Sequence, residues 1–236
     1  MSALSQDKRA VPRAFDRVAA TYDRLTGMNP GYHRHLRLSA SRLSVRSSRP
    51  RLLDLCCGTG ASTEALRAAF PDATIVGLDA SAGMLEVARA KPSLRGVTFV
   101  EGDATDPGAV VEGPFDGILM AYGIRNLAEP DRALRNLRAL LVPKGTIVFH
   151  EYSVADEGLA KKLLWDAICW SVIIPGGLLT AREASLYRYL RTSVRDFDGV
   201  RAFEARLRRA GFVDVWTGPM DGWQRGIVHS FVARAP

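Results

Sequence analysis

The first fifty residues alternate apolar and polar positions with the spacing of helices. Residues 8–24 place Phe15 and Val18 on one face, which predicts an amphipathic helix. A second helix is expected over residues 31–46, because the polar segment 47–50 that follows it ends in a proline. We therefore expect the chain to begin with a helical region.

From residue 51 the pattern changes to short apolar runs that alternate with helical stretches. Strands are expected over residues 51–57, 73–78, 97–101, 115–121, 145–152, 212–217 and 226–234, and helices over 61–69, 81–90, 130–141, 157–174 and 200–210. Such alternation is typical of βαβ units, so we predict an α/β fold whose mostly parallel sheet carries helices on both faces. The last two strands follow one another directly and predict an antiparallel close.

Length and composition fit one domain. The chain has 236 residues, of which 47% are apolar and 24% are charged, which is enough for a packed core. We expect a single domain over residues 1–236, with a helical cap over 1–50, a ligand-binding core over 51–152 and a substrate-side helical insertion over 155–195. This insertion follows the fifth strand.

Other features of the sequence indicate in which cellular compartment the protein is expected. No uninterrupted run of 18 apolar residues occurs, so no membrane-spanning helix is expected. The charged first thirty residues do not resemble a secretory signal. Three cysteines, of which Cys56 and Cys57 are adjacent, predict neither a disulfide framework nor a metal site. The cytoplasm is the expected compartment.

Charge is distributed unevenly along the chain. The net charge is +7, yet residues 1–51 carry eleven Lys or Arg against three Asp or Glu, and residues 52–181 carry eleven against sixteen. Basic flanks favour anionic lipid surfaces or nucleic acid, while the simpler explanation is a solvated, arginine-rich surface. The chain lacks an aromatic and basic RNA-binding motif, so nucleic acid is not an expected partner.

A glycine loop follows the first predicted strand. Gly58 and Gly60 lie between an apolar run and a helix, where they permit a tight turn and let a ligand approach the main chain. The position matches the ligand-binding edge of α/β sheets. Thr63 stands where a dinucleotide fingerprint needs glycine, and no P-loop lysine follows.

Three carboxylates accompany the ends of successive strands. Asp54 precedes Gly58 by four residues and suits a ligand cation; Asp79 suits the two hydroxyls of a ribose; Asp103 suits an adenine amine. Together they describe a ligand with a positive centre, a ribose and an adenine but no phosphate, as in S-adenosylmethionine (SAM). The alternative is that each carboxylate caps a helix or forms a turn.

The motifs D-L-x-x-G-T-G, G-L-D-x-S-x-G-M-L and G-D-A resemble the class I SAM-dependent methyltransferases. Residues 122–127, Y-G-I-R-N-L, resemble the F-G-[IL]-R-N-[VL] segment of the ubiquinone/menaquinone biosynthesis C-methyltransferases. Further segments that resemble this family are 15–23, 151–153 and 187–197, so the likeness runs nearly end to end.

The resemblance implies a Rossmann-like class I methyltransferase fold with SAM as cofactor. Together with the loop and the acids, it places the following residues at the cofactor: Asp54, Gly58, Thr59, Gly60, Asp79, Ala80, Met84, Asp103, Ala104, Ala121 and Tyr122. The chain departs from the family pattern at Ala121, which replaces a serine, and at Cys56–Cys57, which replace a smaller pair.

Methyl transfer to carbon makes a further demand on the site. Positioning supplies much of the catalysis, but a carbon nucleophile needs its neighbouring phenol as phenolate, which requires a base or a cation. Arg125 is the candidate cation, Asn126 can orient it, and Tyr22 can line the pocket. The alternatives are a structural bridge from Arg125 to Glu129 or Asp131, and ordinary aromatic packing of Tyr22.

Two other features leave alternatives open. His150 lies inside the fifth strand and is expected to be a core histidine. Residues 163–174 are unusually apolar and precede a hinge-like break at 175–177. This stretch predicts a buried helix or, alternatively, an oily wall or lid that admits a prenyl tail or leans on a membrane.

The expected function is SAM-dependent methylation of a small aromatic or quinone-like acceptor, at carbon. The alternatives are methylation of a specialised metabolite at C, O or N, and a non-catalytic SAM-fold or RNA-binding protein. Peripheral membrane contact and a homodimer are the other associations that the sequence suggests.

Overall fold

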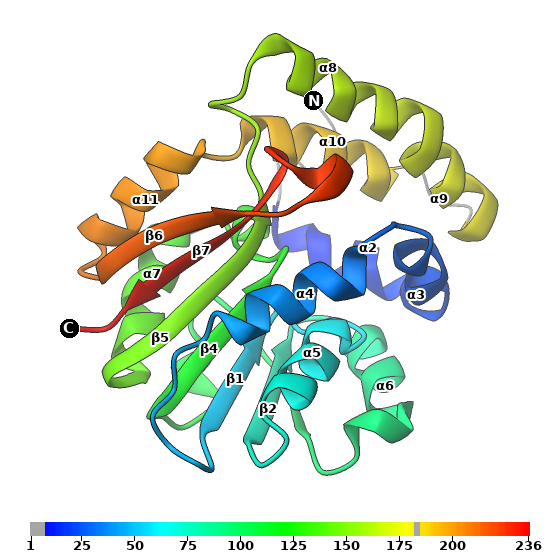
Figure 1. Cartoon of the computed structure of the whole chain (residues 1–236). Coiled ribbons are helices and arrows are strands. Elements are labelled where there is room, and N and C mark those ends of the chain that lie inside the picture. Colours follow the sequence, from blue (N-terminus) through cyan, green and yellow to red (C-terminus); the bar gives the residue numbers. More distant parts are fainter. Residues whose placement is uncertain (1–7, 182–184) are drawn as a thin grey trace.

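A single seven-stranded sheet organises the molecule (Figure 1). The computed structural model describes residues 8–181 and 185–236. Its strands are β1 (Arg51–Leu55), β2 (Thr74–Asp79), β3 (Thr98–Glu101), β4 (Phe115–Ala121), β5 (Leu141–Tyr152), β6 (Val213–Pro219) and β7 (Val228–Arg234), in the order β3-β2-β1-β4-β5-β7-β6. The strands β1 to β5 pair in parallel, and β7 runs antiparallel to both β5 and β6. The predicted α/β class and its antiparallel close are confirmed.

Helices cover both faces of this sheet (Figure 1). The α-helices are α2 (Val11–Asp16), α3 (Ala19–Gly27), α4 (Tyr32–Ser41), α5 (Ala61–Ala69), α6 (Ala82–Ala90), α7 (Pro130–Ala139), α8 (Leu159–Ile168), α9 (Ile174–Ala181), α10 (Ser185–Asp196) and α11 (Val200–Arg209). Because side chains of a strand alternate between faces, Leu53 of β1 packs in the cluster that holds α7 and α11, whereas Leu52 packs with α4 and α5.

Three predicted helices differ in their bounds. The helix expected over 8–24 is broken, since α2 ends at Asp16 and α3 begins at Ala19. The helix expected to reach residue 46 ends at Ser41. The break predicted at 175–177 is wrong, because a π-helical turn over Cys169–Ile173 joins α8 to α9 and the helix runs on to Ala181. Pro175 has no N–H to donate to the preceding turn, and the wider π-helical turn lets the helix continue past this residue.

The segment Leu159–Leu179 bears on the expectation that no helix spans a membrane. Its 21 residues form one helix that is long and apolar enough, by length and composition alone, to cross a membrane. Only 22% of its apolar window is buried inside the protein, so it is not an ordinary core helix. The predicted buried helix is therefore wrong for most of this segment, although Trp165 and Cys169 are fully buried.

Candidate active site

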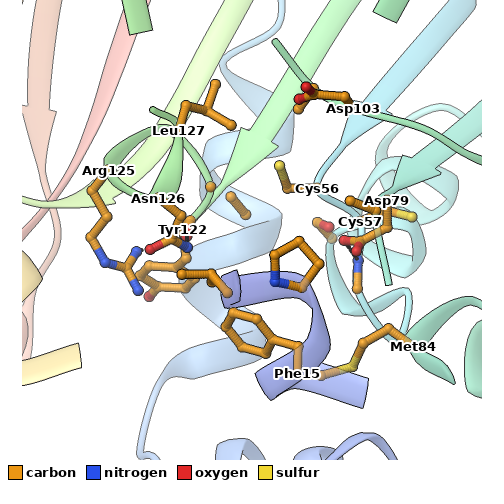
Figure 2. Close-up of a pocket in the computed structure, with 18 of the residues that line it drawn as sticks. Phe15, Cys56, Cys57, Asp79, Met84, Asp103, Tyr122, Arg125, Asn126 and Leu127 are labelled. Atoms are coloured by element: carbon orange, nitrogen blue, oxygen red, sulfur yellow. Dashed lines mark hydrogen bonds between the residues drawn. The ribbon is translucent and has the colours of Figure 1, made fainter. Parts of the chain in front are cut away.

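A cavity of about 530 Å³ opens at the carboxyl ends of β1, β2 and β4, within the size range of small-molecule sites. The strand ends form one wall, and residues of α2, α3 and α4 form the other. All predicted site residues except Asp54 and Gly60 line it: Tyr22, Gly58, Thr59, Asp79, Ala80, Met84, Asp103, Ala104, Ala121, Tyr122, Arg125 and Asn126. In Figure 2, Tyr122, Arg125 and Asn126 lie on one side, opposite Asp79 and Met84.

Asp54 does not reach the cavity. It is fully buried, and its Oδ2 accepts hydrogen bonds from the hydroxyls of Ser62 at 2.8 Å and Thr63 at 2.6 Å. Burial raises the pKa of Asp54 to about 7. The prediction that Asp54 binds a ligand cation is therefore corrected: Asp54 holds the first turn of α5 through two side-chain hydroxyls. It does not cap the helix, because the N-cap of α5 is Gly60. Gly60 has φ +91°, a left-handed backbone conformation that favours glycine.

The glycine loop and Asp79 form a single unit. The backbone N–H groups of Gly58 and Ser81 donate to the two carboxylate oxygens of Asp79 at 2.8 and 2.9 Å. A Cβ atom at Gly58 would meet nothing within 4 Å, so the loop backbone borders open space. Burial raises the pKa of Asp79, and these backbone donors oppose the shift. A ligand can thus contact bare main chain beside a carboxylate.

Asp103 extends this half of the cavity. Its Oδ1 accepts from the N–H of Thr105 at 2.7 Å, which fixes the carboxylate beside Ala104 at the cavity wall. The set of two carboxylates, open glycine backbone and the thioether of Met84 fits the hydroxyls, the amine and the apolar parts of SAM. These residues belong to the set that the sequence predicts to bind SAM.

The opposite side is built around a buried ion pair. Arg125, in a short 3₁₀ turn after β4, donates from Nη1 to Oε1 of Glu151 on β5 and to the carbonyl of Tyr122, both at 2.7 Å. Burial is the largest single effect and lowers the pKa of Arg125, but the Glu151 carboxylate and the nearby tyrosines together outweigh burial, so the net shift of the pKa is upward. The guanidinium thus remains charged, and the predicted alternative bridge to Glu129 or Asp131 is wrong.

Side chains of helix α10 hydrogen-bond to the 3₁₀ turn that carries Arg125 and Asn126. Tyr189 donates its hydroxyl to Oδ1 of Asn126 at 3.0 Å, while the Asn126 amide donates to the Tyr122 carbonyl at 3.2 Å. Ser193 accepts from Nε of Arg125 at 3.4 Å. Both α10 residues lie in the 187–197 segment, whose role sequence reasoning left unassigned.

Tyrosines form much of the wall beside Arg125. The rings of Tyr32 and Tyr122 stack with centroids 5.9 Å apart, and Tyr152 lies 4.8 Å from Tyr122. Burial raises the pKa of Tyr22 and, by more, those of Tyr32 and Tyr122. All are therefore neutral phenols near pH 7. Tyr32 was missed in the sequence, where it is one aromatic residue at the start of a basic helix.

The helical cap is tied to the cofactor half by two aspartates. Asp16 accepts from the hydroxyl of Ser81 at 2.6 Å and from the N–H of Gly83 at 3.0 Å. Asp23 accepts from the Thr59 hydroxyl at 2.5 Å. Residues predicted only as part of a cap helix therefore reach the glycine loop and the start of α6.

The sheet order and this cavity define a Rossmann-like class I fold of the SAM-dependent methyltransferases. Solved structures agree in fold: the [4+2]-cyclase SpnF matches with a TM-score of 0.69 at 18% identity, covering 96% of this chain and 95% of that one. The plantazolicin methyltransferase BpumL, in complex with S-adenosylhomocysteine, matches with a TM-score of 0.65 at 15% identity, covering 97% and 95%.

The chain belongs to the ubiE/COQ5 methyltransferase family, whose model matches residues 2–230. It is 35% identical over 219 residues to the demethylmenaquinone methyltransferase of Clavibacter sepedonicus, covering 90% of this chain and 86% of that protein. It is 34% identical over 203 residues to that of Thermus thermophilus, covering 84% and 90%. The resemblance found in the sequence is confirmed: the protein is a SAM-dependent methyltransferase.

Proposed function

We propose that this enzyme transfers the methyl group of SAM to a ring carbon of a demethylmenaquinol-type acceptor. The observation that carries the proposal is the charged Arg125, held by Glu151 beside the aromatic wall of the cavity. A planar ring fits between tyrosines, and a cation suits the oxygen of a phenolate. The relatives named as demethylmenaquinone methyltransferases support this choice of acceptor.

Bound SAM supplies an electrophilic methyl group. Asp79, Asp103 and the glycine loop hold it on one side of the cavity, while Tyr22, Tyr32 and Tyr122 hold the ring on the other. Arg125 stabilises the phenolate oxygen, which enriches the adjacent ring carbon in electron density. That carbon forms the new C–C bond as the S–CH₃ bond breaks, and it then loses its proton to solvent, which restores the aromatic ring.

The proposal predicts methylation of a reduced short-chain demethylmenaquinone. Purified enzyme with methyl-labelled SAM is expected to give a product labelled on the ring carbon, detected by mass spectrometry and NMR. A panel of polar phenols and catechols serves as the comparison. Turnover of that panel without turnover of the quinol would reject the quinone acceptor and favour tailoring of a specialised metabolite.

The exposed part of α8–α9 suggests how such an apolar acceptor is reached. We infer that this helix contacts an anionic bilayer from the cytoplasmic side, and we call its exposed residues the α8–α9 apolar face: Leu159, Leu163, Leu164, Trp170, Val172, Leu178 and Leu179. Leu179 is 86% exposed, and Met28, which follows the end of the neighbouring helix α3, is 69% exposed. Exposed apolar groups that gather on one element are typical of an interaction surface.

Charge favours lipid as the occupant of the α8–α9 apolar face. Lys161 and Lys162 lie on the same helix, while its carboxylate, Asp166, is paired with Arg191 and Arg195 at 2.8 and 2.7 Å. Each lysine near an anionic surface adds about 1 kcal/mol of attraction. The helix therefore presents apolar groups and cations without an unpaired carboxylate.

Vesicle sedimentation tests this contact. The double substitution Trp170→Glu/Leu179→Glu is expected to weaken binding to phosphatidylglycerol vesicles at least tenfold, because each buried apolar side chain contributes about 1.5–3 kcal/mol. Trp216→Glu on β6, which alters an exposed tryptophan away from this helix, is the matched control. If the double variant instead binds normally and turns a dimer into a monomer, the face belongs to a second copy of the chain.

A further inference from the structure

A chain of buried hydrogen bonds ends at the hydroxyl of Tyr122. Nε2 of His150 lies 2.8 Å from that hydroxyl, and Nδ1 of His150 lies 2.7 Å from Oγ of Ser39. Ser39 is in turn 2.5 Å from Oγ of Ser230. The histidine and both serines are fully buried or nearly so, whereas Tyr122 lines the cavity. The network thus has one end at the site and the other inside the protein.

His150 is neutral in this network. Burial lowers its pKa to about 3, and the positive charges of neighbouring basic groups add to the shift. A neutral imidazole donates from one nitrogen and accepts at the other. Its two contacts, to Tyr122 and to Ser39, are therefore one donated and one accepted hydrogen bond.

Satisfaction of the hydroxyl protons decides the direction. If Tyr122 donated its proton to His150, then His150 would donate to Ser39 and Ser39 would donate to Ser230. The hydroxyl proton of Ser230 would then need a further acceptor. Among the residues that the structure describes, the Ser230 hydroxyl has no partner other than Ser39. In the outward direction Ser230 donates to Ser39, Ser39 to Nδ1 of His150, and Nε2–H of His150 to Tyr122, so no buried proton is left unpaired.

The backbone of Tyr122 supports a placed hydroxyl. This residue has φ +56°, a left-handed conformation that is strained for a residue other than glycine. Its N–H donates to the carbonyl of His150 at 2.7 Å, and its carbonyl accepts from Arg125 and Asn126. Such local strain, retained by surrounding bonds, is concentrated at functional sites. The same bonds keep Tyr122 beside the Arg125 guanidinium (Figure 2).

We propose that Tyr122 donates a hydrogen bond to an oxygen of the methyl acceptor, and that His150, backed by Ser39 and Ser230, is the positioning residue that directs this proton into the cavity. The inference rests on the proposed function, since it takes the acceptor to be an aromatic ring that bears an oxygen. It makes Tyr122 a second stabiliser of the phenolate besides Arg125. The network selects acceptors whose oxygen can accept at this point.

A bound naphthol reports this hydrogen bond without turnover. 1-Naphthol is titrated in saturating enzyme with S-adenosylhomocysteine present, and the naphtholate absorbance is followed. A hydrogen bond to a charged oxygen lowers the pKa of the corresponding phenol by about 1–2 units. Tyr122→Phe is therefore expected to raise the pKa of bound naphthol by that amount relative to the wild type. An equal pKa in the two proteins overturns the inference.

Variants of His150 separate positioning from folding. His150→Leu is expected to raise the pKa of bound naphthol as Tyr122→Phe does, and to add nothing to it in the double variant. His150→Gln, whose amide can still donate to Tyr122, is expected to restore most of the wild-type value. Additive effects, or no rescue by glutamine, would refute the positioning role. S-adenosylhomocysteine affinity within twofold of wild type verifies folding, and quinol turnover by the wild type tests the proposed function separately.

Discussion

Replacement of Arg125 by glutamine is expected to lower the rate of methyl transfer about 100- to 1000-fold, the usual effect of removing a group that stabilises developing negative charge. The affinity for SAM should stay within about twofold, because Arg125 lies across the cavity from Asp79 and Met84 (Figure 2). Single-turnover transfer from labelled SAM measures the rate, and calorimetry measures the affinity.

The buried Glu151 makes a second variant necessary. Arg125→Gln leaves that carboxylate unpaired in the interior, which costs about 3–5 kcal/mol of folding free energy. The double variant Arg125→Gln/Glu151→Gln removes both charges and is expected to regain stability in urea unfolding but not activity. Recovery of activity by the double variant would mean that Arg125 only balances Glu151. Arg125→Lys keeps the charge, loses the planar fork and should be intermediate.

Replacement of Asp79 by asparagine is expected to raise the Kd for SAM at least 100-fold. Two hydrogen bonds from ligand hydroxyls to a carboxylate are worth about 1.5–3 kcal/mol each, and an amide can match only part of that. Asp79 also accepts the N–H groups of Gly58 and Ser81, so the loop itself should loosen. Calorimetric titration with SAM, and with S-adenosylhomocysteine, measures the loss.

Glu101 provides the matched control for Asp79. It is an exposed carboxylate at the end of β3 and is the register partner of Asp79 across the β2–β3 pair. Glu101→Gln removes the same charge one strand away and should change the affinity less than twofold. If Asp79→Asn binds SAM like the wild type while the unliganded protein melts earlier, Asp79 shapes the loop and does not hold the ligand.

Local pattern predicted the sheet and one half of the site. Apolar runs of strand length fix β1 to β4 within a few residues, and parallel strands bring Gly58, Asp79 and Asp103 to one edge. Asp54 shows the limit of this reasoning. Its distance from Gly58 along the chain is suggestive, but the pleat turns its side chain toward Ser62 and Thr63, away from the cavity.

The other half depends on contacts between distant segments. Arg125 pairs with Glu151, rather than with the nearby Glu129 or Asp131, because the β4–β5 register sets Ala121 beside His150. The Tyr122–His150 contact has the same origin. Helical spacing likewise could not show that Tyr189 of α10 reaches Asn126, since their positions are fixed by tertiary packing rather than by local propensity.

Strand β7 lies between β5 and β6 in the sheet and pairs with both. Within residues 8–181 and 185–236, β6 pairs only with β7, and β7 also pairs with β5, which carries Glu151. Opening β7 would therefore release β6 and expose the strand that supports the ion pair. Because β6 depends on β7 for its pairing, the amide protons of β6 should exchange with solvent no more slowly than those of β7. The two strands then form one cooperative unit, and its local opening would expose the ion pair between Arg125 and Glu151 to water.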